Sequence, residues 1–453
     1  MGQRGSNFGR QTHDACGGAQ SRGLYDRARH AIWNRAALIM ASITGISRRL
    51  RQRQAIALMD GLREAIEQWR SDLVPSLVTR HHKILGSQQH ANTLANVVTG
   101  RLDNQLSHAE AGAALAEAAR SLASVKAPPT TWFVWENLSR AIGCFSASLE
   151  FTRGAFDLIT SLPIRSDAER ARLFLAHLYQ GDIDRAGHAW HTSSPTTETA
   201  AFWTDAAHLL WVLTGGESGR AEHTPHEAFA EDISGREVLV WGPAPVSEVP
   251  TVSEGGYIAR VIAPGVTGFD PADALGGRCD IAYASSRVTK ALIASGSPQV
   301  LDQFRWVSFR TDSWKSLDIA HGRTAHHHKR LLPSLWDKTN VIPLAVWDLL
   351  HVEDVSVKVG ATTFFASAQA YTSQETRLKD DATGKTDERG STGLRFERCL
   401  SLSHHNLSAH HQLMALLMKA GALTFDEAGT EVLQMSLADY MAEIDALYGV
   451  EAV

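Results

Sequence analysis

The sequence predicts an α + α/β fold, with an all-helical N-terminal domain followed by a Rossmann-like α/β domain. Between Tyr25 and Gly216, apolar residues recur at intervals of three and four and strand-like alternation is absent, which is typical of helices. After Gly216, short apolar runs bounded by Gly and Pro alternate with helical stretches, which is typical of a parallel sheet. The length of 453 residues is sufficient for two or three domains.

Shifts in composition set the expected domain boundaries. Residues 1–24 are rich in Gly, Arg, Gln and Ser without an apolar period, so we expect a disordered lead. The helical domain then covers residues 25–216, and the polar segment 217–234 is expected to be a linker. Residues 235–453 form the expected α/β domain.

Charge and cysteine usage narrow the class of protein. A net charge of −5 excludes a basic nucleic-acid coat, so nucleic acid is not an expected partner. Cys16, Cys144, Cys279 and Cys399 are scattered without a CxxC pair, which disfavours a disulfide framework or a zinc ribbon and favours a reducing cytoplasm.

One apolar stretch bears on membrane association. Residues 36–46 (AALIMASITGI) are about half the roughly 20 residues that a membrane-spanning helix needs. The basic flank SRRLRQRQ would let this helix lie on an anionic membrane surface. An ordinary helix with an apolar stripe is the preferred interpretation, so we expect a cytoplasmic protein, with a peripheral position on the inner membrane face as the alternative.

A helical hairpin is the sharpest feature of the N-terminal domain. A first helix is expected to end at Tyr179, and Gly181–Asp182 supplies the turn to a second helix from Ile183. The small residues Ala176 and Ala186 would let the two helices approach closely, as in tetratricopeptide hairpins. No strict 34-residue period is visible, so a tetratricopeptide-like domain and an irregular helical bundle both stay open.

The α/β domain is predicted from short apolar runs and the helical stretches between them. The expected strands are residues 237–241, 257–262, 281–283, 304–309 and 355–359. The expected helices are residues 286–294, 342–350, 410–420 and 437–448. The charged, Gly- and Thr-rich segment 376–393 is expected to be a mobile loop that covers a substrate.

The turn after the first strand is a candidate nucleotide site. Gly242-Pro243-Ala244-Pro245 follows residues 237–241, at the sheet edge where ligands bind in open α/β sheets. Gly242 would let a nucleotide approach the backbone, whereas the prolines remove amide donors. Neither GxGxxG nor GxxxxGK[ST] occurs, so redox cofactors and ATP have no support.

Clustered histidines are the candidate acid–base groups. His326 and His327 lie in a run of three histidines, and His404 and His405 precede the helix expected from His410. One imidazole with a near-neutral pKa, held in a cleft, is enough for a general base, although surface histidines are the simpler alternative. HExxH is missing and no DxD follows a strand, so no metal is expected. The basic residues around Arg260 suit an anionic ligand.

Three stretches carry a family resemblance. The first is GREVLVWGPAPVSE with YIARVIAPG and CDIAYASSRVTKAL, the second is NVIPLAVWDLLHVEDVSVKVGATTFFASAQAY, and the third begins LSLSHHNLSAHHQLM. Together they resemble the sialyltransferase-like glycosyltransferases, particularly bacterial relatives in surface-polysaccharide synthesis, over residues 235–449. The chain departs from the family where Gly242-Pro243-Ala244-Pro245 replaces Gly-x-Gly/Ser, where Ser285-Ser286 replaces an Asn, and where Asn406 replaces an acid.

This resemblance implies a glycosyltransferase that moves a sialic-acid- or Kdo-like sugar from a CMP-activated donor to a glycan or lipid-linked glycan. It implies no cofactor and no metal, with His405 as general base and His404 as the fallback. The implied nucleotide and donor residues are Gly242, Pro243, Ala244, Arg260, Asp280, Ser285, Ser286, His326, His327 and Gly360. The helical domain would then meet the acceptor, a membrane surface or a protein partner.

Two other functions remain open at the level of the sequence. One is a non-catalytic binding module, in which a helical domain is joined to a degenerate glycosyltransferase-like domain; the altered turn at Gly242 favours it. The other is a different α/β transferase that uses a nucleotide or a methyl donor.

Overall fold

The structure is a computed structural model of the 453-residue chain. It describes residues 45–68, 70–197, 199–215, 227–244, 251–262, 275, 277–296, 298–309, 324–327, 340–366, 402 and 405–449. The expected disordered lead, the expected loop 376–393 and His404 lie outside the described residues.

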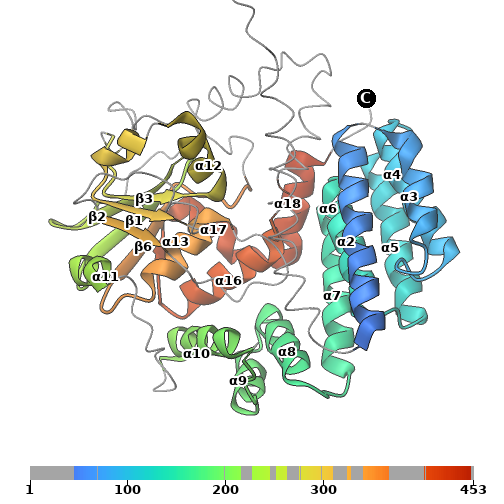
Figure 1. Cartoon of the computed structure of the whole chain (residues 1–453), viewed down its shortest axis with the longest axis horizontal. Coiled ribbons are helices and arrows are strands. Elements are labelled where there is room, and N and C mark those ends of the chain that lie inside the picture. Colours follow the sequence, from blue (N-terminus) through green and yellow to red (C-terminus); the bar gives the residue numbers. More distant parts are fainter. Residues whose placement is uncertain are drawn as a thin grey trace, which may run out of the picture.

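The N-terminal part is helical throughout its described length (Figure 1). Its elements are α2 (Gly45–Glu67), η1 (Ser71–Leu73), α3 (Val74–Arg80), α4 (Gln88–Leu102), α5 (His108–Ser124), α6 (Pro129–Ala141), α7 (Phe145–Ser161), α8 (Asp167–Tyr179), α9 (Ile183–His191) and α10 (Ala200–Thr214). The local sequence explains where several of these helices begin. Ser107 and Glu110 form a reciprocal capping box on α5, and Pro129 occupies the first turn of α6.

The hairpin expected around Gly181 is present as α8 and α9. Gly181 takes a left-handed backbone conformation (φ +75°), and the side chain of Asp182 accepts a hydrogen bond from the amide of Arg185 to cap α9. Ala176 and Ala186 are both fully buried, as close helix packing requires. The tetratricopeptide type of the domain stays a prediction.

The C-terminal part is α/β. In the described part of the chain, one parallel sheet has the strand order β5-β4-β3-β2-β1-β6-β7. The strands are β1 (Glu237–Trp241), β2 (Tyr257–Ile262), β3 (Ile281–Ala284), β4 (Trp306–Phe309), β5 (Thr324–His327), β6 (Ser356–Gly360) and β7 (Thr424–Phe425). The helical elements are α11 (Glu227–Ile233), α12 (Ser286–Ser295), η2 (Pro298–Gln303), α13 (Val341–Leu349), α16 (Leu407–Lys419), α17 (Glu427–Gln434) and α18 (Leu437–Tyr448).

The strand order reverses between β1 and β6. Successive strands run from β1 through β2 to β5 in one direction, whereas β6 and β7 lie on the other side of β1. This arrangement is the doubly wound, Rossmann-like order, and its reversal creates a switch point at the carboxyl ends of β1 and β6.

All five expected strands and all four expected helices are confirmed, with ends that differ by a few residues. Two further strands, β5 and β7, show no hydrophobic pattern, because β5 has the mostly polar sequence TAHH and β7 has only two residues. The second half of the expected linker 217–234 forms α11, because Phe229 and Ile233 are spaced to share one helix face and are fully buried.

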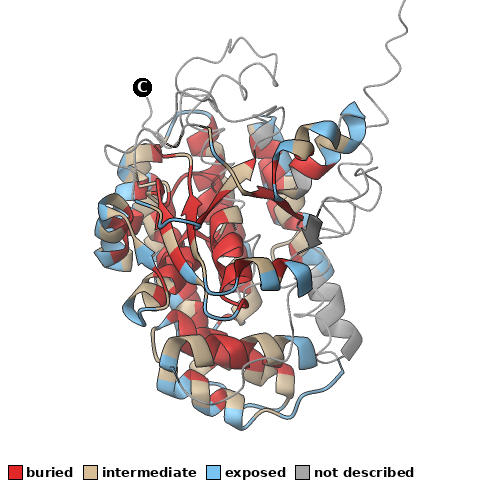
Figure 2. Cartoon of the chain, turned by 90° about the vertical axis from the view of Figure 1, so that its left-hand side faces the viewer, coloured by how far each residue is buried: buried red, intermediate tan, exposed pale blue. Residues whose placement is uncertain are grey.

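The two parts share one hydrophobic core. A single cluster of buried residues extends from Leu58 of α2 through the sheet residue Val238 to Tyr448 of α18. Buried residues fill the middle of the molecule in Figure 2. A smaller cluster on the other sheet face packs α12 and η2 against β3 and β4. None of the described helices has the length and apolar character needed to cross a membrane.

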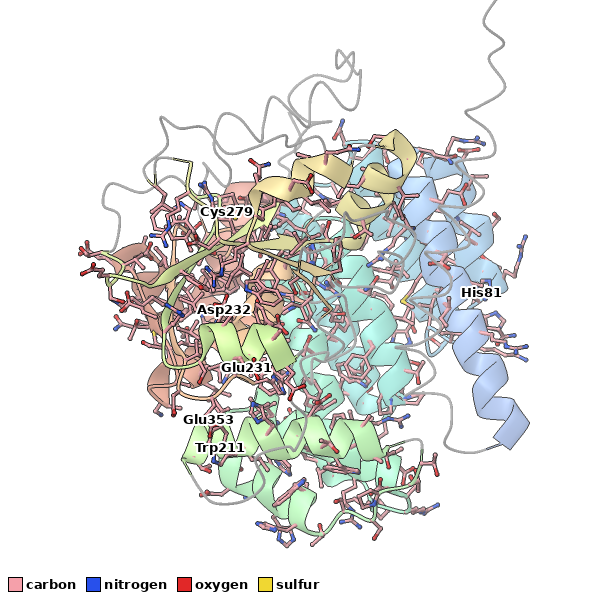
Figure 3. All side chains as sticks on the ribbon, turned by 60° about the vertical axis from the view of Figure 1, so that its left-hand side comes forward. His81, Trp211, Glu231, Asp232, Cys279 and Glu353 are labelled. Atoms are coloured by element: carbon pink, nitrogen blue, oxygen red, sulfur yellow. The ribbon has the colours of Figure 1, made fainter. Side chains whose placement is uncertain are left out.

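The last described helix returns to the helical part. The Asp445 carboxylate on α18 accepts hydrogen bonds from the backbone amides of Phe145 (2.6 Å) and Ser146 (2.9 Å), at the start of α7. A second junction joins α10 to the end of α13, where the His208 ring stacks on His351 with ring centroids 4.0 Å apart. Figure 3 shows Trp211 of α10 near this junction.

Asp232 of α11 organises the amino edge of the sheet. Its carboxylate accepts hydrogen bonds from Arg305 Nε (2.7 Å), Trp306 Nε1 (2.7 Å) and the Tyr257 hydroxyl (3.0 Å). Burial alone would raise the pKa of Asp232, but the hydrogen bonds outweigh burial and hold this pKa below its ordinary value. Asp232 therefore binds α11 to the starts of β2 and β4.

We predict that Asp232→Ala lowers the free energy of unfolding by about 2 kcal/mol at pH 7, because it removes the acceptor of three hydrogen bonds to a charged group. Since the pKa of Asp232 is lowered in the folded state, this contribution is complete above about pH 4, the ordinary Asp range, and is lost as the pH falls through the lowered pKa. Urea unfolding of both proteins at pH 7 and pH 3 measures the difference.

Glu231 is the matched control, because it precedes Asp232 on α11 and is exposed (Figure 3). Glu231→Ala should change the unfolding free energy by less than about 0.5 kcal/mol. Equal effects of the two substitutions would contradict the assigned role of Asp232.

Candidate functional site

The switch point lies where the turn after β1 meets the loop after β6. The amide of Gly242 donates to the Gly360 carbonyl (2.8 Å), and the amide of Ala244 donates to the Ala361 carbonyl (2.9 Å). Pro243, between them, has no amide hydrogen. The backbone of residues 242–244 therefore continues the pairing of β1 with β6, and its amides are already used as donors.

Two glycines permit this close approach. A Cβ atom at Gly242 would overlap the Ala361 carbonyl, and one at Gly360 would lie 2.7 Å from the Trp241 ring. The sequence therefore places glycine at both positions because of backbone and ring packing. Of the predicted donor residues, Gly242, Pro243, Ala244 and Gly360 lie together at the switch point.

The loop after β6 has an unusual backbone. Ala361, Phe364 and Phe365 all have positive φ angles (+51°, +48° and +72°). Such conformations cost roughly 1–3 kcal/mol each in residues other than glycine, and they cluster at functional sites. The Asp426 carboxylate accepts a hydrogen bond from the Ala361 amide (2.7 Å), and the Tyr440 hydroxyl donates one to the Phe364 carbonyl (2.6 Å). These two contacts hold the loop in place.

Two further predicted donor residues, Arg260 and Ser285, lie on β2 and directly after β3. Arg260 is half-buried and is paired in register with Trp241, the last residue of β1. Ser285 follows β3 and caps α12, its hydroxyl accepting a hydrogen bond from the Val288 amide (3.3 Å). Helix α12 begins at Ser286, so its N-terminal amides and partial positive charge lie at the carboxyl edge of the sheet.

Three other predicted donor residues lie away from the switch point. Asp280 precedes β3 at the amino edge, where its carboxylate accepts the Ile258 amide (2.8 Å) and pairs with Arg278 (2.8 Å). His326 and His327 are in β5, at the far edge of the sheet. Four strand spacings separate β5 from β1, which is about 19 Å.

His405 immediately precedes α16. Its carbonyl accepts hydrogen bonds from Arg140 Nη1 (2.5 Å) and from the Leu407 amide (3.1 Å), and its ring centroid lies 6.3 Å from that of His410. The next residue on the helix, His411, stacks on Tyr440 with ring centroids 4.4 Å apart. Because Tyr440 also binds the loop after β6, the first turns of α16 are linked to the switch point.

His411 is a packing residue. Its Nε2 atom donates to the Val432 carbonyl (2.9 Å), and burial lowers the pKa of the imidazole, which the hydrogen bond to Val432 only partly opposes. The neutral ring therefore belongs to the core beneath the site. His410 is also buried, so of the described histidines in this segment His405 is the most accessible.

Grouped metal ligands and reactive thiols are two other kinds of site that the described residues could form. Among them, no three His, Cys, Asp or Glu side chains are grouped closely enough to hold a metal ion. Burial raises the pKa of both Cys144 and Cys279 to about 12, so neither thiol is ionised near neutral pH. Figure 3 places Cys279 at the sheet.

Comparison with family models, with curated proteins and with solved structures gives no match to this chain. The fold class and the switch-point geometry therefore rest on the structure of this chain alone. The resemblance to sialyltransferase-like glycosyltransferases stays a hypothesis on the motifs quoted above.

Two residues of the site could not be predicted from the sequence. Asp426 follows the two-residue strand β7 and caps α17, so only a helix-start signal, Asp before EAGTEVL, marks it. Arg140 binds His405 from 265 positions away in the sequence, and no local pattern reveals that contact.

We predict that Gly242→Ala disrupts the switch point. The added methyl group cannot fit against the Ala361 carbonyl, so the turn must move away from the loop after β6 and lose two backbone hydrogen bonds. The free energy of unfolding should fall by about 2–4 kcal/mol, in the range of other overpacking and hydrogen-bond losses. Urea unfolding measures it.

Gly112→Ala is the control, because a Cβ atom there has no neighbour within 4 Å and the residue lies inside α5. This substitution should be stabilising by about 0.5–1 kcal/mol. Equal behaviour of the two variants would argue against the close approach at Gly242.

Proposed function

We propose that this chain is a glycosyltransferase that uses a CMP-activated, sialic-acid- or Kdo-like donor and a glycan acceptor. The observation that carries this proposal is the switch point at β1 and β6, where a strained loop is held at the edge of a doubly wound sheet. In sheets of this order, ligands bind outside the carboxyl ends of the strands at the reversal. The motif likeness to sialyltransferase-like enzymes supplies the donor class.

The donor phosphate is assigned to groups on β2 and directly after β3. The amides of Gly242 and Ala244 already donate to β6, so this turn supplies shape and no hydrogen bonds to a phosphate. We assign the phosphate to two electropositive groups, Arg260 of β2 and the N-terminus of α12 beyond Ser285. A cationic side chain and helix amides can stabilise one departing phosphate by charge-assisted hydrogen bonds without a divalent ion.

We assign the removal of the proton from the acceptor hydroxyl to His405. In the proposed reaction, His405 takes the proton of an acceptor hydroxyl while that oxygen bonds to the anomeric carbon. The bond from this carbon to the phosphate oxygen breaks at the same time, and CMP leaves with the electron pair. Histidine is the residue type most often used for such a proton transfer near neutral pH. His404 remains the fallback base.

We predict selective binding of CMP. Calorimetric titration should detect CMP and not UMP or ADP, and the affinity should be unchanged by EDTA, because the proposed phosphate contacts need no metal. S-adenosylhomocysteine serves as the control for a methyltransferase. Binding of another nucleotide in place of CMP would move the proposal to that donor class, and binding of none would overturn it.

We predict that His405→Ala lowers turnover of a CMP-linked sugar by about 10²–10⁴-fold, the usual contribution of general-base catalysis. The affinity for CMP should stay within about twofold, because the imidazole acts on the acceptor. His188→Ala is the matched control, since His188 is exposed on α9. Normal turnover of His405→Ala would remove His405 from the mechanism.

A second candidate function is a non-catalytic binding module. The engaged amides of the turn after β1 favour it, because a phosphate cradle in that turn would need them. The two candidates differ in one result. A binding module would hold CMP or a glycan without turning over any CMP-linked donor, whereas the proposed enzyme would release CMP.

A further inference from the structure

A buried ion pair lies where the helical part meets α16. Glu136 and Arg140 are one turn apart on α6, and their side chains are 7% and 1% exposed. Arg140 Nε lies 2.6 Å from Glu136 Oε1, and Arg140 Nη2 donates to Glu136 Oε2 (3.2 Å). Removing two charges from water is costly, so a pair this deep in the protein needs well-placed hydrogen bonds on every arm.

The remaining arm of Arg140 reaches the candidate site. Its Nη1 atom donates to the His405 carbonyl at 2.5 Å, and the Leu407 amide donates to the same oxygen. The following residue, Asn406, caps α16 by accepting hydrogen bonds from the Ala409 amide (3.0 Å) and the Ser408 hydroxyl (2.9 Å). The guanidinium therefore binds the backbone at the point where α16 begins.

A second helix of the N-terminal part supports the same turn. The Tyr179 hydroxyl of α8 is fully buried beside Ser408, and burial raises the pKa of this phenol. The turn after α8 also contacts α16, since a Cβ atom at Gly181 would lie 3.2 Å from Gln412 Nε2. Residues of α6 and α8, and the turn after α8, therefore contact the start and first turns of α16.

We infer that Arg140 is a positioning residue, through which the helical part fixes the His405-bearing start of α16. The helical part is then a component of the site. The structural half of this inference, that Arg140 fixes the start of α16, is supported by the contacts alone. Its catalytic meaning rests on the proposed function, in which His405 is the base.

Hydrogen exchange of the amides in residues 402–411 tests the structural half. Arg140→Lys keeps a positive charge beside Glu136, but one ammonium group cannot bind both Glu136 and the His405 carbonyl as the guanidinium fork does. Exchange in this segment should become about 10- to 100-fold faster, the effect of losing one hydrogen bond from a charged donor.

If Arg140→Lys does not fold, the double variant Glu136→Met/Arg140→Met allows the same exchange measurement. It removes both charges together, and apolar replacement of a buried pair is often neutral for stability. Residues 402–411 should exchange faster here as well, while α4 and β1 exchange as in the wild type.

The control is Arg153→Lys, because Arg153 pairs with Glu150 on the neighbouring helix α7 at the exposed surface. It should leave exchange in residues 402–411 unchanged. Wild-type exchange of this segment in both Arg140→Lys and the double variant would overturn the inference. A uniform increase over the whole protein would also overturn it, since that would show only lower global stability.

Turnover of a CMP-linked sugar tests the catalytic half. Arg140→Lys should lower kcat and change its pH profile, because His405 is displaced, while the Kd for CMP stays near the wild-type value. If the wild type neither binds CMP nor turns over a donor, the proposed function fails, and the exchange experiment still decides the role of Arg140. If the wild type is active and Arg140→Lys has the same kcat and pH profile as the wild type, Arg140 does not position the base.

Discussion

The burial of α16 is the constraint on which the rest of the structure depends. Eight of its thirteen residues are buried, including the polar residues Ser408, His410 and His411. A helix that buries most of its circumference needs partners on several sides. Helices α17 and α18 contact it from the α/β part, and α8 and α10 contact it from the helical part, so both parts contribute to its burial.

The polar groups at this junction explain why the two parts stay in one arrangement. An apolar face alone tolerates sliding, whereas Arg140 has a fixed fork that must meet Glu136 and the His405 carbonyl together. Separating the parts would leave the Glu136–Arg140 pair without its third contact and would expose the shared core. Farther along α16, His411 stacks on Tyr440, whose hydroxyl binds the loop after β6.

Local sequence signals predicted most of the fold. The run at Glu237–Trp241 is long enough and apolar enough to mark a buried strand, and the Gly and Pro after it mark the turn. By contrast, β7 has two residues, and its existence depends on pairing with β6. Helix α11 was not predicted, because it lies in a polar segment and only Phe229 and Ile233 mark its buried face.

The candidate site was predicted in part, for physical reasons. The sequence placed Gly242 and Gly360 at the carboxyl edge, because strand ends can be located from local pattern. It could not show that the amides after β1 are engaged by β6, or that Ala361, Phe364 and Phe365 take positive φ angles without any glycine. Asp280 was grouped with the donor residues because of the family resemblance, but it lies at the amino end of β3.

Native-state hydrogen exchange across increasing urea tests most directly whether the two parts form one unit. If the core is shared as described, the slowest amides of α7 and of β1 will report the same free energy of opening and the same dependence on urea. Two separate values, with the sheet opening while α7 stays protected, would show that the parts unfold independently and would contradict the account.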